Sequence, residues 1–335
     1  MAVGSSVGDR LIGTRPPGIE SGAGTPPGIV LRVAGLSKRY GDIQAVRDVS
    51  FTVRAGEVYG FLGPNGSGKS TTIAMLLGLV APTAGTIELF GRGPAGRAEA
   101  LARVGAIIEA PSFYPYLSGF DNLSVLGALR GGITTARIRE VLALVDLAGA
   151  ADRRFGQYSL GMKQRLGIAW TLIHDPDLII LDEPTNGLDP AGMVEVRALI
   201  RRLADGGTTV FLSSHLLNEV EQVCDRVAIL KHGAVLAEGR VVDLIDRRPR
   251  AVVQVDRAGE ALRLLAALPG VERVTQSDDG DLIVEGEVAP ERVADTLVRA
   301  GHALYELRRE RISLEHVFLD LTGSMDDTDG EAHHG

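Results

Sequence analysis

The stretch "VYGFLGPNGSGKSTTIAMLLGL", residues 58–79, predicts the fold of the larger part of the chain. It reads as a short apolar strand, a glycine-rich turn and an apolar helix, and the turn fits the pattern G-x-x-x-x-G-K-[ST]. The glycines let successive backbone N–H groups face a phosphate, and the helix N-terminus adds its partial positive charge. We therefore expect Lys69 to reach the β- and γ-phosphates of a nucleoside triphosphate, and the Ser70 hydroxyl to bind Mg²⁺.

Two acidic residues end a second apolar run, in "DPDLIILDEPTNGLDP" at residues 175–190. Residues 178–181 are typical of a buried parallel strand, and ligands bind at the carboxyl edge of such sheets. We expect Asp182 to hold Mg²⁺, and Glu183 to orient and deprotonate the attacking water.

A histidine follows a third apolar strand, in "TTVFLSSHLLNEVEQVCDRVAIL" at residues 208–230. A histidine just beyond a strand end is usually a cap or a surface residue. Because the other two motifs share this sheet edge, we favour a functional interpretation in which the His215 imidazole contacts the γ-phosphate.

With these three motifs, residues 30–240 resemble an ATP-binding cassette (ABC) ATPase, the cytosolic motor of an ABC transporter. The segment "YSLGMKQRLGIA" at 158–169 resembles the family signature, "GLD" ending at Asp189 its D-loop, and Tyr40 in "SKRYG" the aromatic residue that stacks on adenine. The resemblance implies that Ser159 and Gly161 contact ATP bound to a second subunit, in a homodimer with two ATPs at its interface. The nucleotide-binding residues it implies are Tyr40, Gly63, Pro64, Asn65, Gly66, Ser67, Gly68, Lys69, Ser70, Thr71, Ser159, Gly161 and Asp189.

The signature departs from the family pattern at two positions. Leu160 stands where the first of two glycines is usual, and Met162 where glutamine is common; Gly161 is kept. The departures put the rate of hydrolysis in doubt, so a regulatory or non-transport cassette with slow hydrolysis is the alternative function.

The segment "IIEAPSFYPYL" at 107–117 lies where this family has its Q-loop, before a helical insert over residues 118–170. Glu109 takes the place of the usual glutamine, which makes it a third candidate metal ligand. The sequence of this segment resembles that of the bacitracin- and lantibiotic-immunity branch of the family. The aromatic residues Phe113, Tyr114 and Tyr116 fit a contact with a short helix of the membrane subunit. Their packing inside the insert's own core is the open alternative.

Residues 250–322 predict a second, smaller domain. Strand-like and helical runs alternate in the order βαββαβ, a ferredoxin-like pattern. The closing "ISLEHVFLDLTG" resembles the accessory C-terminus of ATPases that serve ABC-2-type drug exporters. Dimer support and regulation are equally open as its role. The predicted fold class is therefore α/β: a P-loop NTPase cassette, with a RecA-like core and a helical subdomain, followed by a small α+β domain.

The composition agrees with a protein that works inside the cell. No run approaches the eighteen apolar residues of a membrane helix, and no secretory signal is recognisable. The net charge is −8 with no basic block, which gives no reason to expect a nucleic acid partner. Residues 1–28, rich in Gly, Ser, Thr and Pro, predict a disordered leader, and residues 323–335 an acidic tail.

These observations predict a peripheral ATPase subunit on the cytoplasmic face of the cell membrane. It would use ATP and Mg²⁺, dimerise on ATP and drive a separately encoded ABC-2-type permease. An antibiotic-like or peptide cargo is expected for its export.

Overall fold

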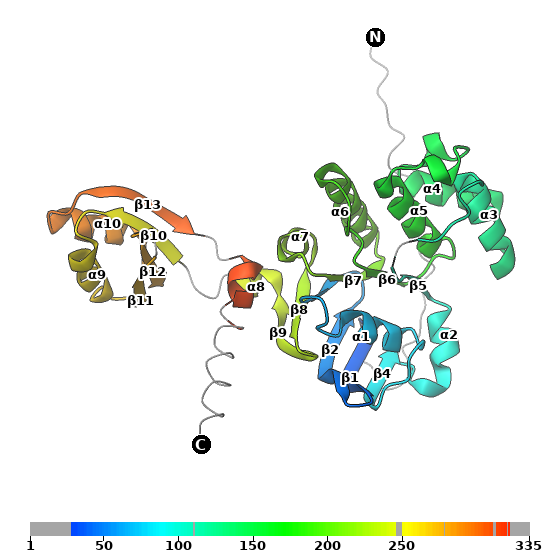
Figure 1. Cartoon of the computed structure of the whole chain (residues 1–335), viewed down its shortest axis with the longest axis horizontal. Coiled ribbons are helices and arrows are strands. Elements are labelled where there is room, and N and C mark those ends of the chain that lie inside the picture. The colour runs from blue at the N-terminus through cyan, green and yellow to red at the C-terminus, as the bar shows by residue number, and fades with distance from the viewer. Residues whose placement is uncertain are drawn as a thin grey trace, which may run out of the picture. The chain divides into compact units, whose positions relative to one another are not determined.

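The computed structural model describes residues 28–109, 111–245, 250–277, 279–310, 313–319 and 321 of the 335-residue chain. The described chain divides between Glu238 and Gly239 into two compact units (Figure 1). The predicted acidic tail and nearly all of the predicted leader lie outside the described residues. Among the described residues, no helix combines the length and the apolar character needed to cross a bilayer.

A six-stranded sheet forms the centre of the N-terminal unit, in the order β5-β6-β7-β3-β8-β9. The first four pairings along this order are parallel, and the strands β3, β6 and β7 are buried at every position. Continuous burial explains why these strands read as unbroken apolar runs. The strands are β3 (Val58–Leu62), β5 (Val104–Ile107), β6 (Leu178–Asp182), β7 (Thr209–Ser214), β8 (Arg226–Lys231) and β9 (Ala234–Arg240).

A three-stranded antiparallel sheet, β2-β1-β4, packs on the central sheet. It comprises β1 (Ile29–Tyr40), β2 (Ile43–Arg54) and β4 (Ala84–Leu89). The Phe51 ring of β2 lies 5.2 to 5.8 Å from the rings of Tyr59, Phe61 and Phe211 on the central sheet. These rings form one core with the buried face of α1 (Lys69–Leu76), which therefore holds the glycine-rich turn between the two sheets.

Three helices make up the predicted insert: α3 (Gly119–Arg130), α4 (Thr135–Leu144) and α5 (Leu160–Leu172). Each begins after a serine or threonine whose side chain accepts a backbone N–H from the first turn: Ser118, Thr134 and Ser159. The three lie together at one end of the N-terminal unit (Figure 1). Two further helices, α6 (Pro190–Asp205) and α7 (Leu217–Val223), follow β6 and β7 in the chain.

The remaining short elements of this unit are α2 (Arg97–Leu101) and the single 3₁₀ turns η1 (Pro94–Gly96), η2 (Ala148–Ala150) and η3 (Phe155–Gln157).

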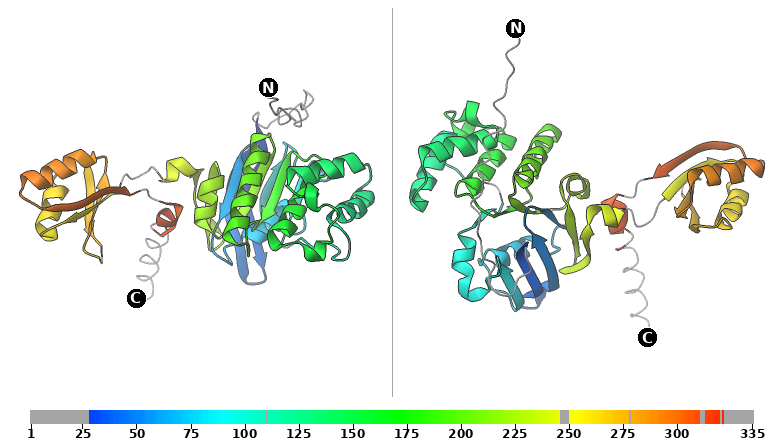
Figure 2. Two further views of the ribbon diagram at one scale, coloured as in Figure 1. Left: turned by 90° about the horizontal axis from the view of Figure 1, so that it is seen from above. Right: turned by 180° about the vertical axis from the view of Figure 1, so that it is seen from behind.

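The C-terminal unit starts with α8 (Val241–Ile245) and has a four-stranded antiparallel sheet in the order β11-β12-β10-β13. Two helices pack on one face of the sheet and close a separate apolar core (Figure 2). Residues 314–319 form a further helical turn. The elements are β10 (Arg250–Val255), α9 (Ala258–Ala266), β11 (Val271–Gln276), β12 (Leu282–Gly286), α10 (Pro290–Arg299) and β13 (Leu304–Glu310).

Candidate nucleotide-binding and hydrolysis site

The glycine-rich turn joins the end of β3 to the start of α1, as the sequence predicts. Gly68 precedes the helix with φ 100°, and a Cβ there would lie 2.5 Å from the Ala45 carbonyl oxygen. A Cβ on Gly63 would lie 2.5 Å from the carbonyl oxygen of Leu230. Only glycine fits at these two positions, and the first turn of α1 presents its free N–H groups beside them.

Lys69, the first residue of α1, curls back over this turn. Its Nζ donates to the carbonyl oxygens of Gly63 at 2.6 Å and Pro64 at 3.2 Å, and lies 3.4 Å from Glu183 Oε1. The side chain is only 6% exposed, so its charge acts in a partly desolvated setting. The Ser67 hydroxyl beside it is buried without a hydrogen-bond partner among the described residues, as expected of a group that faces a ligand.

Asp182 and Glu183 lie at the carboxyl edge of β6, next to β7. Asp182 accepts a short hydrogen bond from the Ser213 hydroxyl, and the same hydroxyl accepts the backbone N–H of Glu183 at 3.0 Å. Glu183 has φ 49°, a left-handed conformation that costs energy in a residue with a side chain. The strained turn aims its carboxylate away from the strand axis and toward Lys69.

The Glu183 carboxylate bridges two candidate catalytic groups. Oε1 faces the Lys69 ammonium, while Oε2 lies 2.8 Å from His215 Nδ1 and accepts the His215 backbone N–H at 3.3 Å. The structure thus brings Lys69, Glu183 and His215 into one cluster, although they come from α1 and from the ends of β6 and β7. A carboxylate at this position can take a proton from a water that attacks a phosphate on the turn.

The three candidate metal ligands differ in their surroundings. Ser70 is exposed in the first turn of α1, and Asp182 is 6% exposed. Glu109 is exposed with φ 62°, two residues beyond Ile107, whose β-ladder partner is Leu181. The register therefore sets Glu109 at the same sheet edge as Asp182 and Glu183. A hydroxyl and two carboxylates are oxygen ligands of the kind Mg²⁺ prefers, so the donor set fits this ion.

The signature segment meets the D-loop within the same chain. Ser159 is the N-cap of α5, and its hydroxyl accepts the Met162 N–H at 3.2 Å. A Cβ on Gly187 would lie 3.4 Å from Leu160 Cδ2, so the leucine that replaces the usual glycine covers the D-loop backbone. Ser159 thus contacts the first turn of its own helix, and a Cβ on Gly161 would lie 3.8 Å from Gly192 Cα of α6.

Asp189 and Tyr40 occupy two further positions. The Asp189 carboxylate accepts the Gly192 N–H at 3.0 Å and so caps α6. Tyr40 ends β1 with 46% of its surface exposed, and Lys38 Nζ lies 4.9 Å from its ring centroid. The free part of this ring is available for stacking.

The aromatic residues after β5 divide between two environments. The Phe113 ring packs edge-on against Phe155 at 5.2 Å, whereas Tyr114 and Tyr116 are 46% and 66% exposed. The buried amide of Asn122 binds the backbone of Tyr114 in both directions, at 2.8 and 3.1 Å. For Phe113, packing inside the insert is thus the interpretation that the geometry supports.

Sequence reasoning missed Ser213. Its hydroxyl, near the end of β7, binds both Asp182 and the backbone N–H of Glu183 at the end of the neighbouring strand β6, and the signal for it was its place two residues before His215.

Comparison with known proteins agrees with this geometry. A sequence model of the family described as "ABC transporter" matches residues 46–186. A bacitracin transport ATP-binding protein of Bacillus licheniformis is 39% identical, over 88% of this chain and 97% of its own length. A daunorubicin/doxorubicin resistance ATP-binding protein of Streptomyces peucetius is 38% identical, over 89% of this chain and 94% of its own.

Solved structures resemble the N-terminal unit. A subunit of the ABC transporter complex cbiONQ from Clostridium perfringens superposes with a TM-score of 0.59 at 28% identity, covering 64% of this chain and 89% of that one. An ATP-binding cassette solved as a dimer in a post-hydrolysis state with ADP and phosphate gives a TM-score of 0.56 at 25% identity. It covers 63% of this chain and 98% of its own.

Proposed function

The chain belongs to the ATP-binding subunits of ABC transporters, and we propose that it is the motor of an exporter with an antibiotic-like or peptide cargo. Binding and hydrolysis of ATP, coupled to transport, are the activity of this family. The observation that carries the exporter assignment is similarity along nearly the whole chain, C-terminal unit included, to ATP-binding proteins of bacitracin transport and drug resistance. The partner we infer is a separately encoded ABC-2-type permease, with the chain on the cytoplasmic face of the membrane.

The geometry suggests how ATP would prepare the site for hydrolysis. Lys69 is paired with Glu183 and with the carbonyl groups of its own turn. The phosphates of ATP would take over the Lys69 ammonium, because they carry more negative charge than a single carboxylate. Glu183 would then keep His215 as its partner on Oε2, and Oε1 would be free to accept the proton of the attacking water.

Mg²⁺ would be held by Ser70 and Asp182, with Glu109 near enough along the sheet edge to take part. When bound, the ion offsets the charge that develops on the phosphate oxygens. Glu109 adds attraction to the metal and repulsion of the γ-phosphate. At about 4 Å and an effective dielectric near 20, each contribution is about 4 kcal/mol per unit of the partner's charge before desolvation, so the two largely offset.

A magnesium titration tests the assignment of Glu109. The Glu109→Gln variant should stay active and need more Mg²⁺ for its half-maximal rate, since it lacks one attractive charge. Asp182→Asn is the matched comparison, and should lose activity at every Mg²⁺ concentration. An unchanged Mg²⁺ requirement in Glu109→Gln would remove this residue from the metal site.

Two subunits would complete the site. ABC ATP-binding subunits dimerise, and we infer that Ser159 and Gly161 reach the ATP bound by the partner subunit. Tyr40 would stack on the adenine of the ATP bound by its own subunit. The position of Ser159 as the cap of α5 supports the first of these contacts, because a helix N-terminus favours an anion.

Mixing two inactive variants tests the shared site. A Ser159→Arg subunit keeps its own phosphate turn and a Lys69→Ala subunit keeps its own signature, so a heterodimer has one intact composite site. Partial recovery of ATPase activity is the expected result. No recovery, with heterodimers shown to form, would contradict the shared arrangement.

We infer that residues 250–310 form a ferredoxin-like accessory domain. The support is the order strand–helix–strand–strand–helix–strand, with the fourth strand beside the first and the third beside both the first and the second. The domain has its own core of buried residues, as a separately folding unit requires.

Coupling to a permease separates the exporter from a regulatory cassette with slow hydrolysis. Tyr114 and Tyr116 stay exposed beside the insert, where rings give large contact area at low entropy cost. Steady ATP turnover by the purified protein, raised by a co-purified membrane partner, is the outcome expected of the motor. Turnover that is absent both alone and with the partner would favour the regulatory cassette.

A further inference from the structure

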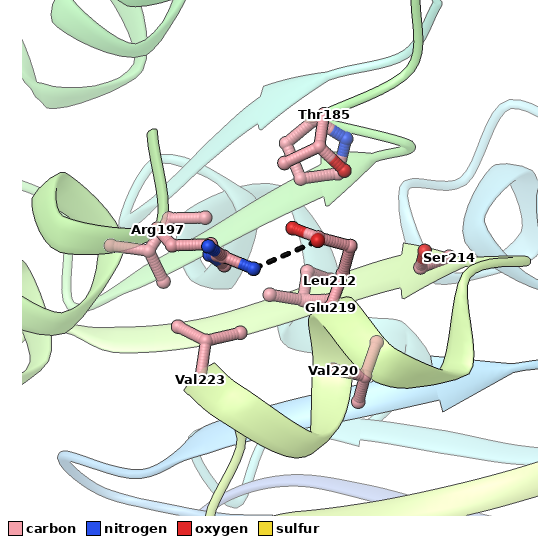
Figure 3. A pocket seen from close by; sticks show the side chains of 9 residues that line it. Thr185, Arg197, Leu212, Ser214, Glu219, Val220 and Val223 are labelled. Atoms are coloured by element: carbon pink, nitrogen blue, oxygen red, sulfur yellow. Dashed lines mark hydrogen bonds and ion pairs between the residues drawn. The ribbon is translucent and has the colours of Figure 1, made fainter. Parts of the chain in front are cut away.

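A partly buried ion pair joins α6 to α7 (Figure 3). Arg197 Nη1 of α6 lies 2.8 Å from Glu219 Oε1 of α7, and each side chain is only 17% exposed. Figure 3 shows the two side chains pointing toward each other from their separate helices. The two helices start at functional segments: α6 directly follows Asp189, and α7 begins two residues after His215.

The surroundings of the pair are mostly apolar. It borders a small pocket whose wall includes Pro184 and Thr185, the residues that follow Glu183. Ile200, Leu212 and Val220 line the same pocket. The second oxygen of Glu219, Oε2, is buried and has no hydrogen-bond partner among the described residues.

Such a pair adds little to stability for its cost. Desolvation of two charges consumes most of their attraction, and apolar residues of similar size often stabilise as well or better. A carboxylate oxygen left without a partner makes the balance worse. The arrangement is therefore better explained by the geometry that it imposes on the two helices.

We propose that the Arg197–Glu219 pair positions His215 against the Glu183 carboxylate. His215 binds Glu183 Oε2 through both its ring and its backbone N–H, so its place depends on the backbone at the start of α7. No side chain caps α7 at Leu216, and Glu219 lies one helical turn beyond His215. Arg197 lies on α6, the helix that follows the D-loop, and thereby holds the first turn of α7 in place.

The far end of α7 is held differently. A Cβ on Gly60 would lie 2.7 Å from Val220 Cγ1, in the middle of α7, and 2.9 Å from Cys224 Sγ, just after the helix, so the middle and the far end pack closely on β3. Loss of the ion pair would therefore let the His215 end shift while the far end stays in place. The inference rests on the proposed ATPase function and assigns Arg197 and Glu219 as positioning residues, which do not touch ATP.

A second bridge between the same helices provides a matched control. Arg201 Nη1 lies 2.9 Å from Asp225, just after α7, and both side chains are about 40% exposed. The variants are Arg197→Met, Arg197→Lys and Glu219→Gln, with Arg201→Met as control. For each we would measure kcat and KM for ATP, and the free energy of unfolding in urea.

We expect Arg197→Met and Glu219→Gln to lower kcat about tenfold or more with KM changed less than about twofold, since a misplacement of about 1 Å can cost 10²-fold. Arg197→Lys should recover part of the loss. Arg201→Met should keep kcat and lower the free energy of unfolding by about 1 kcal/mol or less, because its pair is more exposed. Equal loss of kcat in Arg201→Met, or a normal kcat in Glu219→Gln, would overturn the proposal.

A His215→Ala background gives a readout that a merely structural role would not move. If Arg197 acts through His215, Arg197→Met should lower kcat no further in that background, because effects within one coupled unit are not additive. An equally large additional loss would assign the pair to stability alone. A wild-type protein without turnover would instead count against the ATPase function itself.

Discussion

The strained backbone of Glu183 places its carboxylate between two candidate catalytic groups. With φ 49°, it leaves the strand direction and reaches both Lys69 and His215. Replacement by glutamine keeps the shape of the side chain, but removes its charge and the group that accepts a proton.

Glu183→Gln should therefore bind ATP, lose hydrolysis by about 10²-fold or more and accumulate an ATP-bound dimer. Single-turnover ATPase assays and the oligomeric state with ATP would measure this. Lys69→Ala is the contrasting variant, because it should weaken nucleotide binding itself. Hydrolysis by Glu183→Gln at a near-normal rate would refute its assignment as the base.

His174, at the end of α5, makes stability depend on pH. Burial, and then the charge of Arg130, lower its pKa from the ordinary value of 6.5. Nε2 lies 3.2 Å from the Val104 carbonyl oxygen, and Nδ1 is buried with no hydrogen-bond partner in the described part of the chain. The folded state thus resists protonation, whereas the unfolded chain takes up the proton near pH 6.5.

The free energy of unfolding should consequently fall as the pH drops below 6.5, and reach its full loss below the lowered pKa of the folded state. The slope from this group is at most about 1.4 kcal/mol per pH unit, the limit for one proton. Urea unfolding between about pH 7.5 and 5.5 measures it. His174→Gln should flatten the dependence, and an equal slope in that variant would assign the effect to other groups.

At the scale of elements, the loop between β5 and α3 has two functions in one short stretch. Phe113 contacts Phe155 of the insert, while Tyr114 and Tyr116 contact each other at 5.8 Å and stay exposed. Asn122 holds the loop backbone in place, so the two tyrosines are presented from a fixed support.

Alanine variants of this loop should affect two different properties, the stability of the fold and the stimulation of the ATPase by the permease. Phe113→Ala should lower the free energy of unfolding by about 1–3 kcal/mol, less than for a fully buried ring, because Phe113 is half-buried. Tyr114→Ala with Tyr116→Ala should change it by about 0.5 kcal/mol or less, yet reduce stimulation of the ATPase by the permease. Urea unfolding and ATPase assays with and without the membrane partner separate the two. Normal stimulation in the tyrosine variant would exclude these rings from the contact.

At the scale of the whole molecule, two separate apolar cores indicate two cooperative units. One core joins the sheets around α1, and the other lies between α9, α10 and the four-stranded sheet. All the candidate nucleotide-binding residues belong to the N-terminal unit.

ATP should therefore protect only one unit from hydrogen exchange. At a hundredfold excess over Kd, a ligand stabilises the unit that binds it by about 2.7 kcal/mol. In Glu183→Gln, which prevents turnover, ATP should slow exchange in the amides of β3, β6 and β7. Exchange in β10–β13 should not change when the protein is diluted below the concentration at which ATP makes it dimerise. Slowed exchange there would show that the two units are coupled.

The sequence alone determined the glycine-rich turn, the two acidic residues at the end of β6 and the histidine after β7. Each belongs to a local pattern, in which a continuous apolar run gives a buried strand and the following residues lie at the sheet edge. The helical insert was predicted from the family resemblance, and the structure shows that Ser118 and Ser159 cap its first and last helices.

Only the tertiary structure decided which of these groups touch. The Ser213 hydroxyl meets Asp182 across 31 residues of chain, and Arg197 meets Glu219 across 22. Phe113 likewise packs against the insert only because Phe155 is folded beside it. Propensity and periodicity describe neighbours along the chain, whereas these contacts depend on strand order and helix packing, which bring together residues whose local sequences contain no sign of each other.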